Sequence, residues 1–169
     1  KFRLSSPNYS GRMDQLRASI LRVQLPRLEE NIVRWNRLYQ KLFKNLSKVE
    51  GITIPDRVDK EFYVGSSIQF RVNIRSPEEI ERFLNSCARR GVQLKWLGDT
   101  QPKGYTSRYD SWKFFNDIPH LSQTLEILRN TIDMRIPLTF NEQDCILICN
   151  IIEEVLESSE KTNQVEPNI

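Results

Sequence analysis

The sequence predicts an α+β fold in which a small, mostly antiparallel sheet of about three strands is packed by helices. Three observations predict this class. Apolar and polar residues alternate in three short segments, as they do in half-buried strands. Longer segments between and before them repeat apolar residues at helical spacing. The chain has 169 residues, 38% of them hydrophobic and 28% charged, so we expect one globular domain with a core of its own.

The first element is a long helical segment over about residues 12–47, kinked at Pro26. Proline lacks a backbone donor and clashes with the preceding turn, so a break near Leu25 is expected, with Pro26 in the first turn of a second helix. This second helix is longer than the sheet requires, and we expect it to serve a neighbouring domain or subunit as well. Its apolar residues recur at spacings of four and three, which predicts one buried stripe: Leu28, Ile32, Trp35, Tyr39, Leu42 and Leu46.

The middle of the chain is expected to form a strand, a helix and a second strand. Alternation begins near residue 68 and defines the first of these strands. Ser76, Pro77 and Glu79 then form the sequence pattern of a capped helix start, and Gly91 predicts the end of that helix. Residues 92–96 alternate again as the second strand. An irregular, polar and aromatic loop follows.

The last part of the chain is expected to contain a helix, a strand and a final helix. Ser122 is the predicted cap of the short helix, residues 132–138 form the third strand, and Asn141 or Thr139 caps the last helix. These boundaries divide the chain into an N-terminal loop and long helical segment (1–47), a small α+β domain (48–157) and a polar tail (158–169).

Composition excludes several classes of protein. The net charge is only +3 and basic residues do not cluster, so a nucleic-acid partner is not expected. No apolar run is long enough to cross a membrane. The six glycines form no phosphate-binding loop. The three cysteines are an odd number and fit a reducing cytoplasm; Cys145 and Cys149 are interpreted as core residues, and His120 as a surface or capping residue.

Two regions are candidates for ligand binding. Asn8 and Arg12 lie in a polar loop before a helix, where amide donors and a guanidinium suit a phosphate or carboxylate. Helix capping with an exposed arginine is the alternative interpretation. The loop that follows Lys95 and Trp96 and continues to Trp112 is rich in aromatic and basic residues, which suits polar ligands with flat apolar faces such as sugars. The alternative there is a loop that packs its own aromatic side chains.

Several motifs resemble the DegT/StrS family of sugar aminotransferases, which are pyridoxal phosphate (PLP) enzymes of fold type I. The segment N-Y-S-G-R-M-D-Q-L-R-A-S-I, continued by Q-L-P-R-L, is similar to the family's N-Y-R-M-S-E-L-Q-A-A and Q-L-x-R-L stretch. The resemblance covers about residues 8–156. Further similar pieces follow in the family's order: G-I-x-x-P at 51–55, Q-F at 69–70, R-G-V at 90–92, and I-P-L-T at 136–139 followed by Glu142.

The resemblance implies the C-terminal part of such an enzyme, in which residues 1–47 link the small C-terminal domain (48–157) to a missing large domain. That large domain would carry the lysine that binds PLP, so the chain alone is expected to be inactive. It implies that Asn8 contacts the PLP phosphate across a homodimer and that Arg12 lies beside it, although Ser10 and Gly11 are inserted between the matching positions. Gln69 matches a position near the substrate. The family's H-Y-x-x-P-x-H motif is absent, which indicates a divergent subgroup.

The expected function is therefore transfer of an amino group from an amino-acid donor to a keto-sugar or sugar-nucleotide substrate in the cytoplasm. The expected substrate-binding residues are Gln69, Lys95 and Trp96, and no catalytic residue or metal ligand is assigned to this chain. A degenerate family member retained only for assembly is one alternative, and a free-standing α+β ligand-binding or regulatory module is the other. A stable monomer that binds a small ligand unaided would favour that alternative.

Overall fold

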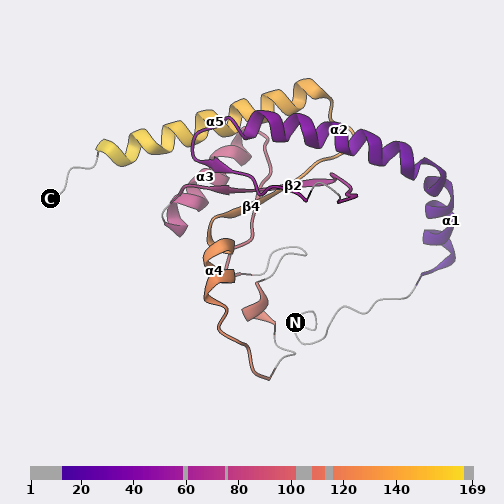
Figure 1. The fold of residues 1–169 in the computed structure, drawn as a ribbon, viewed down its shortest axis with the longest axis horizontal. Helices are drawn as coiled ribbons and strands as arrows, with labels where there is room; N and C mark the ends of the chain where they lie inside the picture. Colours follow the sequence, from indigo (N-terminus) through magenta and orange to yellow (C-terminus); the bar gives the residue numbers. More distant parts are fainter. Residues whose placement is uncertain (1–12, 59–60, 75, 102–107, 113–115, 166–169) are drawn as a thin grey trace.

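A computed structural model describes residues 13–58, 61–74, 76–101, 108–112 and 116–165 (Figure 1). The α-helices are α1 (Gln15–Gln24), α2 (Leu28–Leu46), α3 (Pro77–Arg89), α4 (Ser122–Arg129) and α5 (Glu142–Val165). Two short 3-10 helices are η2 (Leu25–Arg27) and η3 (Tyr109–Ser111). The strands are β1 (Ile52–Thr53), β2 (Ser67–Val72), β3 (Lys95–Trp96) and β4 (Thr131–Arg135).

The sheet has the strand order β1-β2-β4-β3, and every neighbouring pair is antiparallel. The prediction of a small antiparallel sheet with helices is therefore confirmed. The sheet has four strands rather than about three, because Ile52 and Thr53 pair with the end of β2. The strand predicted over 132–138 ends at Arg135, just before Pro137, which has no N–H to donate to a strand ladder.

Pro26 separates two helices, as predicted. Helix α1 ends at Gln24, the 3-10 turn η2 contains the proline, and α2 begins at Leu28. Figure 1 shows α1 turning away from the line of α2 at the end of the molecule opposite the C-terminus. No residue of α1 is buried by the described part of the chain.

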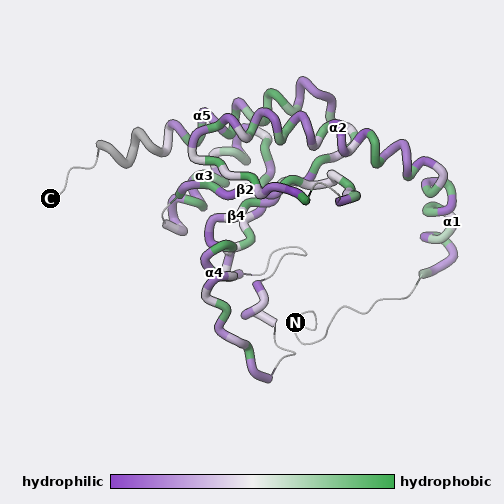
Figure 2. The backbone as a smooth tube through the Cα atoms, viewed as in Figure 1, coloured by the Kyte–Doolittle hydropathy of each residue, from purple (hydrophilic) through white to green (hydrophobic). Residues whose placement is uncertain are grey.

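The core lies between one face of the sheet and helices α2, α3 and α5. Only the second half of the predicted α2 stripe enters it, because Leu42 and Leu46 are fully buried whereas Leu28 is 45% exposed. Figure 2 shows hydrophobic and hydrophilic residues alternating along these elements. The largest fully buried side chains are Phe70, Phe83, Leu42, Leu46, Ile68, Ile80, Ile132, Ile136 and Ile152.

Two of the three helix caps that the sequence predicts are present in the structure. Ser76 accepts from the Glu79 backbone N–H while the Glu79 carboxylate accepts from the Ser76 N–H, which completes a capping box. Asn141 Oδ1 accepts from the N–H of Asp144 at 3.0 Å. The prediction for Ser122 is wrong, because this serine is the first residue of α4 and the helix has no side-chain cap.

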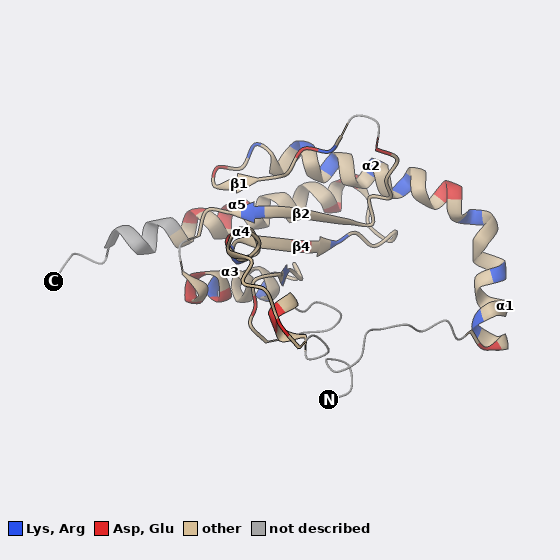
Figure 3. Ribbon diagram, turned by 60° about the horizontal axis from the view of Figure 1, so that its bottom comes forward, with Lys and Arg blue, Asp and Glu red and all other residues tan. Residues whose placement is uncertain are grey.

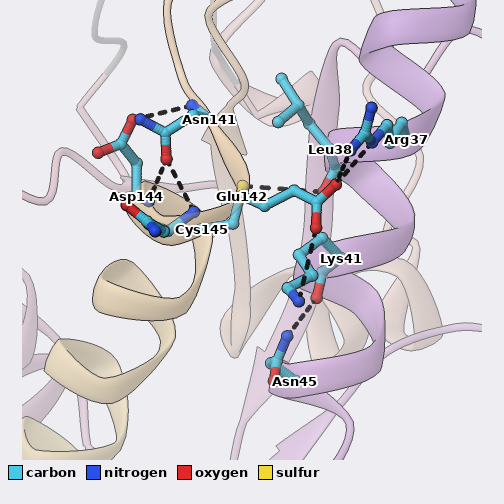
Figure 4. Close-up of polar contacts among 9 residues, drawn as sticks. Arg37, Leu38, Lys41, Asn45, Asn141, Glu142, Asp144 and Cys145 are labelled. Atoms are coloured by element: carbon cyan, nitrogen blue, oxygen red, sulfur yellow. Dashed lines mark hydrogen bonds and ion pairs between the residues drawn. The ribbon is translucent and has the colours of Figure 1, made fainter.

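Polar contacts fix α5 against α2 (Figure 4). The Glu142 carboxylate accepts from Arg37 Nε at 2.6 Å and lies 3.7 Å from Lys41 Nζ. The indole N–H of Trp35 donates to the Ile136 carbonyl at 2.9 Å, which ties α2 to the segment after β4. Helix α5 continues to Val165, beyond the residue at which the sequence predicted a polar tail.

The segment between β1 and β2 is held on α2 by an arginine that stacks on two tyrosines. The Arg57 guanidinium lies 4.1 Å from the Tyr63 ring centroid and 5.0 Å from that of Tyr39. Asn36 donates to the Tyr63 carbonyl at 3.0 Å and accepts from the Gly65 N–H at 2.7 Å. These contacts fix the entry of the chain into β2.

Candidate functional site

The sheet carries its polar side chains on the face opposite the core. In β2, Ile68, Phe70 and Val72 are buried, so the alternating residues Gln69 and Arg71 lie on the other face, where they are exposed. We call this surface the open face; it comprises the exposed or half-buried side chains of Ser67, Gln69, Arg71, Lys95, Asp133 and Arg135.

The register aligns three of these residues across the open face. Gln69 pairs with Asp133, and Asp133 pairs with Lys95 on its other side. Because neighbouring strands lie about 4.8 Å apart, Gln69 and Lys95 start about 10 Å from each other with the carboxylate between them. The structure therefore brings two of the expected substrate-binding residues together.

The third expected residue, Trp96, lies on the opposite side of the sheet from Lys95. Trp96 pairs with Ile132, whose side chain is fully buried in the core. Its indole N–H donates to the Arg129 carbonyl at 2.7 Å, at the end of α4. Trp96 and Gln69 therefore face different sides of the sheet.

The other expected ligand residues, Asn8 and Arg12, lie outside the described residues. The described chain begins at Met13, next to the cap of α1. Asp14 accepts from the Arg17 N–H at 2.8 Å, so the helix start that follows these two positions is capped by its own carboxylate.

Part of the long loop after β3 is organised around an ion pair. Arg108 donates from Nε to Asp110 at 3.0 Å and from a terminal nitrogen to the Gly98 carbonyl at 3.3 Å. The hydrogen bond from Arg108 is the main reason why the pKa of Asp110 lies below its ordinary value. Arg108 and Asp110 therefore hold the described part of this loop together.

The charges of the open face favour one kind of ligand. Three cations, Arg71, Lys95 and Arg135, surround one carboxylate, Asp133, so a polar or anionic ligand is favoured. Among the described residues, shifted pKa values belong to three buried cysteines and to the ion-paired Arg57, Arg108, Asp110 and Glu142.

The described residues do not by themselves fit PLP. PLP is held as a Schiff base on a lysine, and the lysine side chains that the structure describes are exposed or half-buried on the surface of this chain. Lys41 already faces Glu142, and Lys95 lies on an edge strand of the open face. In the described part of the chain, no group of metal-ligating side chains comes together and no helix is suited to crossing a bilayer.

Sequence reasoning missed Asp133 as a site residue. The sequence shows only that it alternates with Ile132 and Met134, which places it on the polar face of a strand. Its position between Gln69 and Lys95 depends on which strands are neighbours, and β4 comes between β2 and β3 although it follows both in sequence. No local signal contains that order.

Comparison with known protein families identifies one family that this chain matches. A model of the DegT/DnrJ/EryC1/StrS aminotransferase family matches residues 1–145. No curated protein matches the sequence at a significant level.

Solved structures of aminotransferases share the fold. The aminotransferase TlmJ from Streptoalloteichus hindustanus is 16% identical with a TM-score of 0.68, over 90% of this chain and 40% of its own. The 3-amino-5-hydroxybenzoic acid synthase is 17% identical with a TM-score of 0.69, over 90% and 43%. Spr1654 from Streptococcus pneumoniae, a proposed sugar aminotransferase solved in a PLP form, is 15% identical with a TM-score of 0.63, over 91% and 38%. This chain thus spans about two fifths of each neighbour.

Proposed function

This chain belongs to the DegT/DnrJ/EryC1/StrS aminotransferase family, and from that membership we propose that it supplies the small domain and linking helix of a PLP-dependent transaminase. The observation that carries the proposal is the family match over residues 1–145, together with a fold shared with aminotransferases more than twice as long. The proposed reaction moves an amino group from an amino-acid donor to a keto-sugar or a related sugar-nucleotide substrate in the cytoplasm.

In this proposal the chain binds and positions ligands, and the lysine that holds PLP comes from another part of the enzyme. The exposed lysines described above support this division. Bound PLP would supply the electron sink for amino transfer. Asn8 and Arg12 are proposed to approach the cofactor phosphate across a homodimer, because they match the family motif.

The open face is the proposed substrate surface of this chain. Gln69 offers an amide that donates and accepts, and Lys95 offers a cation beside it, with Asp133 between them to orient both. Trp96 lies on the other side of the sheet, so its contribution is support of strand β3 from the core side.

Helix α1 supports the proposal that a further domain packs on this chain. Met13, just before the helix, and Leu16, Ile20 and Val23 within it lie three or four residues apart, and each is at least 51% exposed. Figure 3 shows basic residues on the same helix, at the end of the molecule farthest from α3. An apolar stripe of this kind normally faces a core.

Transaminase activity tests the proposal. The chain should be assayed alone and joined to whatever its gene encodes before Lys1, with glutamate as donor and a nucleotide-linked keto-sugar as acceptor. The proposal expects 2-oxoglutarate from the joined protein and none from the chain alone. Activity from the chain alone would contradict the division of labour, and a longer protein that neither binds PLP nor transfers an amino group would contradict the function.

A free-standing ligand-binding module is the second candidate, and one observation favours it. The chain has a continuous core of its own, so it has the means to fold independently. A module of this kind would be a stable monomer that binds a small molecule without PLP. Sedimentation analysis of the chain together with ligand titration separates it from the transaminase proposal.

A further inference from the structure

The segment between β1 and β2 carries apolar side chains that the described fold leaves exposed. Phe62 is 89% exposed and Val58 is 75% exposed, and Val64 is exposed as well. Val33, also exposed, lies three residues before Asn36, on the side of α2 that holds this segment. Single exposed apolar residues are ordinary, whereas several on one surface mark an interaction site. We call Val33, Val58, Phe62 and Val64 the apolar patch.

The exposure of Phe62 follows from the anchoring of its neighbour. Asn36 donates to the Tyr63 carbonyl at 3.0 Å, and Gln40 donates to the Tyr63 hydroxyl at 2.6 Å. The Arg57 guanidinium lies 4.1 Å from the centroid of the same ring. Adjacent side chains of an extended segment face opposite ways, so Phe62 is exposed while Tyr63 is half-buried against α2. Turning Phe62 inward would break the contacts of Tyr63.

A side chain that is fixed before it binds suits a docking site. Binding then costs less conformational entropy, because the segment is already ordered by its contacts with α2. Large aromatic side chains at the centre of an interface supply much of the binding energy of protein interfaces. Phe62 therefore has the chemistry and the placement of an anchor residue.

The patch lies close to the surface proposed to bind substrate. Val64 is three residues from Ser67, the first residue of β2, and β2 carries Gln69 on the open face. Figure 3 shows the segment between β1 and β2 running beside α2 toward the start of β2. A domain seated on the patch would therefore lie at the end of the sheet where this strand begins.

The size of the solved relatives favours one occupant. This chain covers 40% of TlmJ and 43% of the 3-amino-5-hydroxybenzoic acid synthase, so more than half of each of those proteins has no counterpart in it. We propose that the apolar patch is a seat for the domain that carries the PLP lysine, with Phe62 as its anchor. This inference rests on the proposed function. It adds a second surface to the one on α1, from a distant part of the chain.

Cysteine labelling tests the patch in the whole protein. Phe62→Cys is made in the chain alone and in the longer protein that its gene encodes, and labelling by a disulfide reagent is mapped by peptide mass spectrometry. The three native cysteines are buried, so the introduced thiol is the main target in this chain. It should react about 10-fold more slowly in the longer protein, because the other domain covers it. Leu147→Cys, at an exposed apolar position on α5, is the matched control and should react equally in both proteins.

Thermal denaturation of Phe62→Ser gives a second measurement. In the chain alone this substitution should leave the melting temperature unchanged, because the side chain has little contact to lose. In the longer protein it should lower the melting temperature by several degrees, since it removes apolar surface buried between the domains. Phe62→Leu should retain most of the stability, and Leu147→Ser should have the same small effect in both proteins.

The outcomes separate this inference from the proposed function. Equal labelling of Phe62→Cys in both proteins, equal protection of Leu147→Cys, or a gene that encodes no domain before Lys1 would overturn the inference. Protection in the chain alone, together with a dimer in sedimentation, would identify a second copy as the occupant and also overturn it. Protection of Phe62→Cys in a longer protein that binds no PLP would support the docking surface and contradict the function. An active transaminase with an open patch would contradict only the inference.

Discussion

Burial at the level of single residues makes the three cysteines unreactive. Loss of hydration on burial raises the pKa of Cys87 and Cys149 to about 12 and that of Cys145 to about 11. The thiolate is the nucleophile, so very little reactive species forms near neutral pH. These cysteines therefore serve packing rather than catalysis, as the sequence predicted for Cys145 and Cys149.

Thiol labelling checks this expectation. The folded chain at about pH 8 should react with a disulfide reagent at least 100-fold more slowly than the chain in denaturant. All three thiols should become reactive together on unfolding, because they belong to one core. Rapid modification of one cysteine in the folded protein would show that its surroundings are open to water.

Gly65 is required by close packing rather than by its backbone angles. A Cβ at this position would lie 2.6 Å from Tyr39 Cβ, and both residues are buried. Gly65→Ala should lower the free energy of unfolding by about 1–3 kcal/mol, since the chain must shift to avoid overlap. Urea denaturation measures the change. Ser66→Ala, at the exposed neighbouring position, should stay within about 0.5 kcal/mol of the unchanged protein.

At the scale of elements, the junction of α2 and α5 should depend on pH. Hydrogen bonding from Arg37, followed by its charge and that of Lys41, holds the pKa of Glu142 below its ordinary 4.5. A carboxyl group with a lowered folded pKa stabilises the fold above its unfolded pKa, and that contribution is lost as pH falls through the folded pKa.

Denaturation at several pH values tests this junction. Glu142→Gln should reduce stability at neutral pH and should lose less stability than the unchanged protein between about pH 5 and pH 3. The Glu157→Gln variant, at an exposed position on the same helix, is the matched control. Parallel pH profiles for the Glu142 variant and the unchanged protein would contradict a linkage through this carboxylate.

Helix α1 should open far more readily than α2. It has ten residues, none of them buried, and an isolated helix shorter than about 12–15 residues is marginally stable in water. Amide hydrogens of α1 should exchange with little protection, whereas those of Leu38–Leu46 should be protected by the core. Equal protection in both helices would mean that α1 is covered in solution.

Local sequence signals predicted where helices and strands lie better than they predicted which elements pair or pack together. The capping box at Ser76, the break at Pro26 and the cap at Asn141 all act within a few residues, and all three are present. Residues 51–55 were predicted as a turn and a short extended piece, but not as a strand of the sheet, because the two residues of β1 are too few to show alternation. Ser122 was wrongly predicted as a cap because its neighbours alone do not fix where the first turn of α4 begins.

At the scale of the whole molecule, sequence predicted the fold class and part of the open face. Gln69 and Lys95 share a face, but the insertion of β4 between β2 and β3 is a long-range property, so Asp133 was not predicted. Trp96 was grouped with Lys95 although adjacent residues of a strand point to opposite faces. Asn8 and Arg12 lie outside the described residues, and their cofactor role remains a proposal.

PLP binding tests the central claim, that this chain forms the small domain of a transaminase whose cofactor lysine lies elsewhere. The chain and its longer gene product are titrated with PLP, reduced with borohydride and mapped by peptide mass spectrometry. The account predicts stoichiometric labelling of one lysine upstream of Lys1 in the longer protein, and no saturable absorbance change or dominant labelled lysine in the chain alone. Stoichiometric labelling of a single lysine in the chain alone, at Lys95 for example, would contradict it.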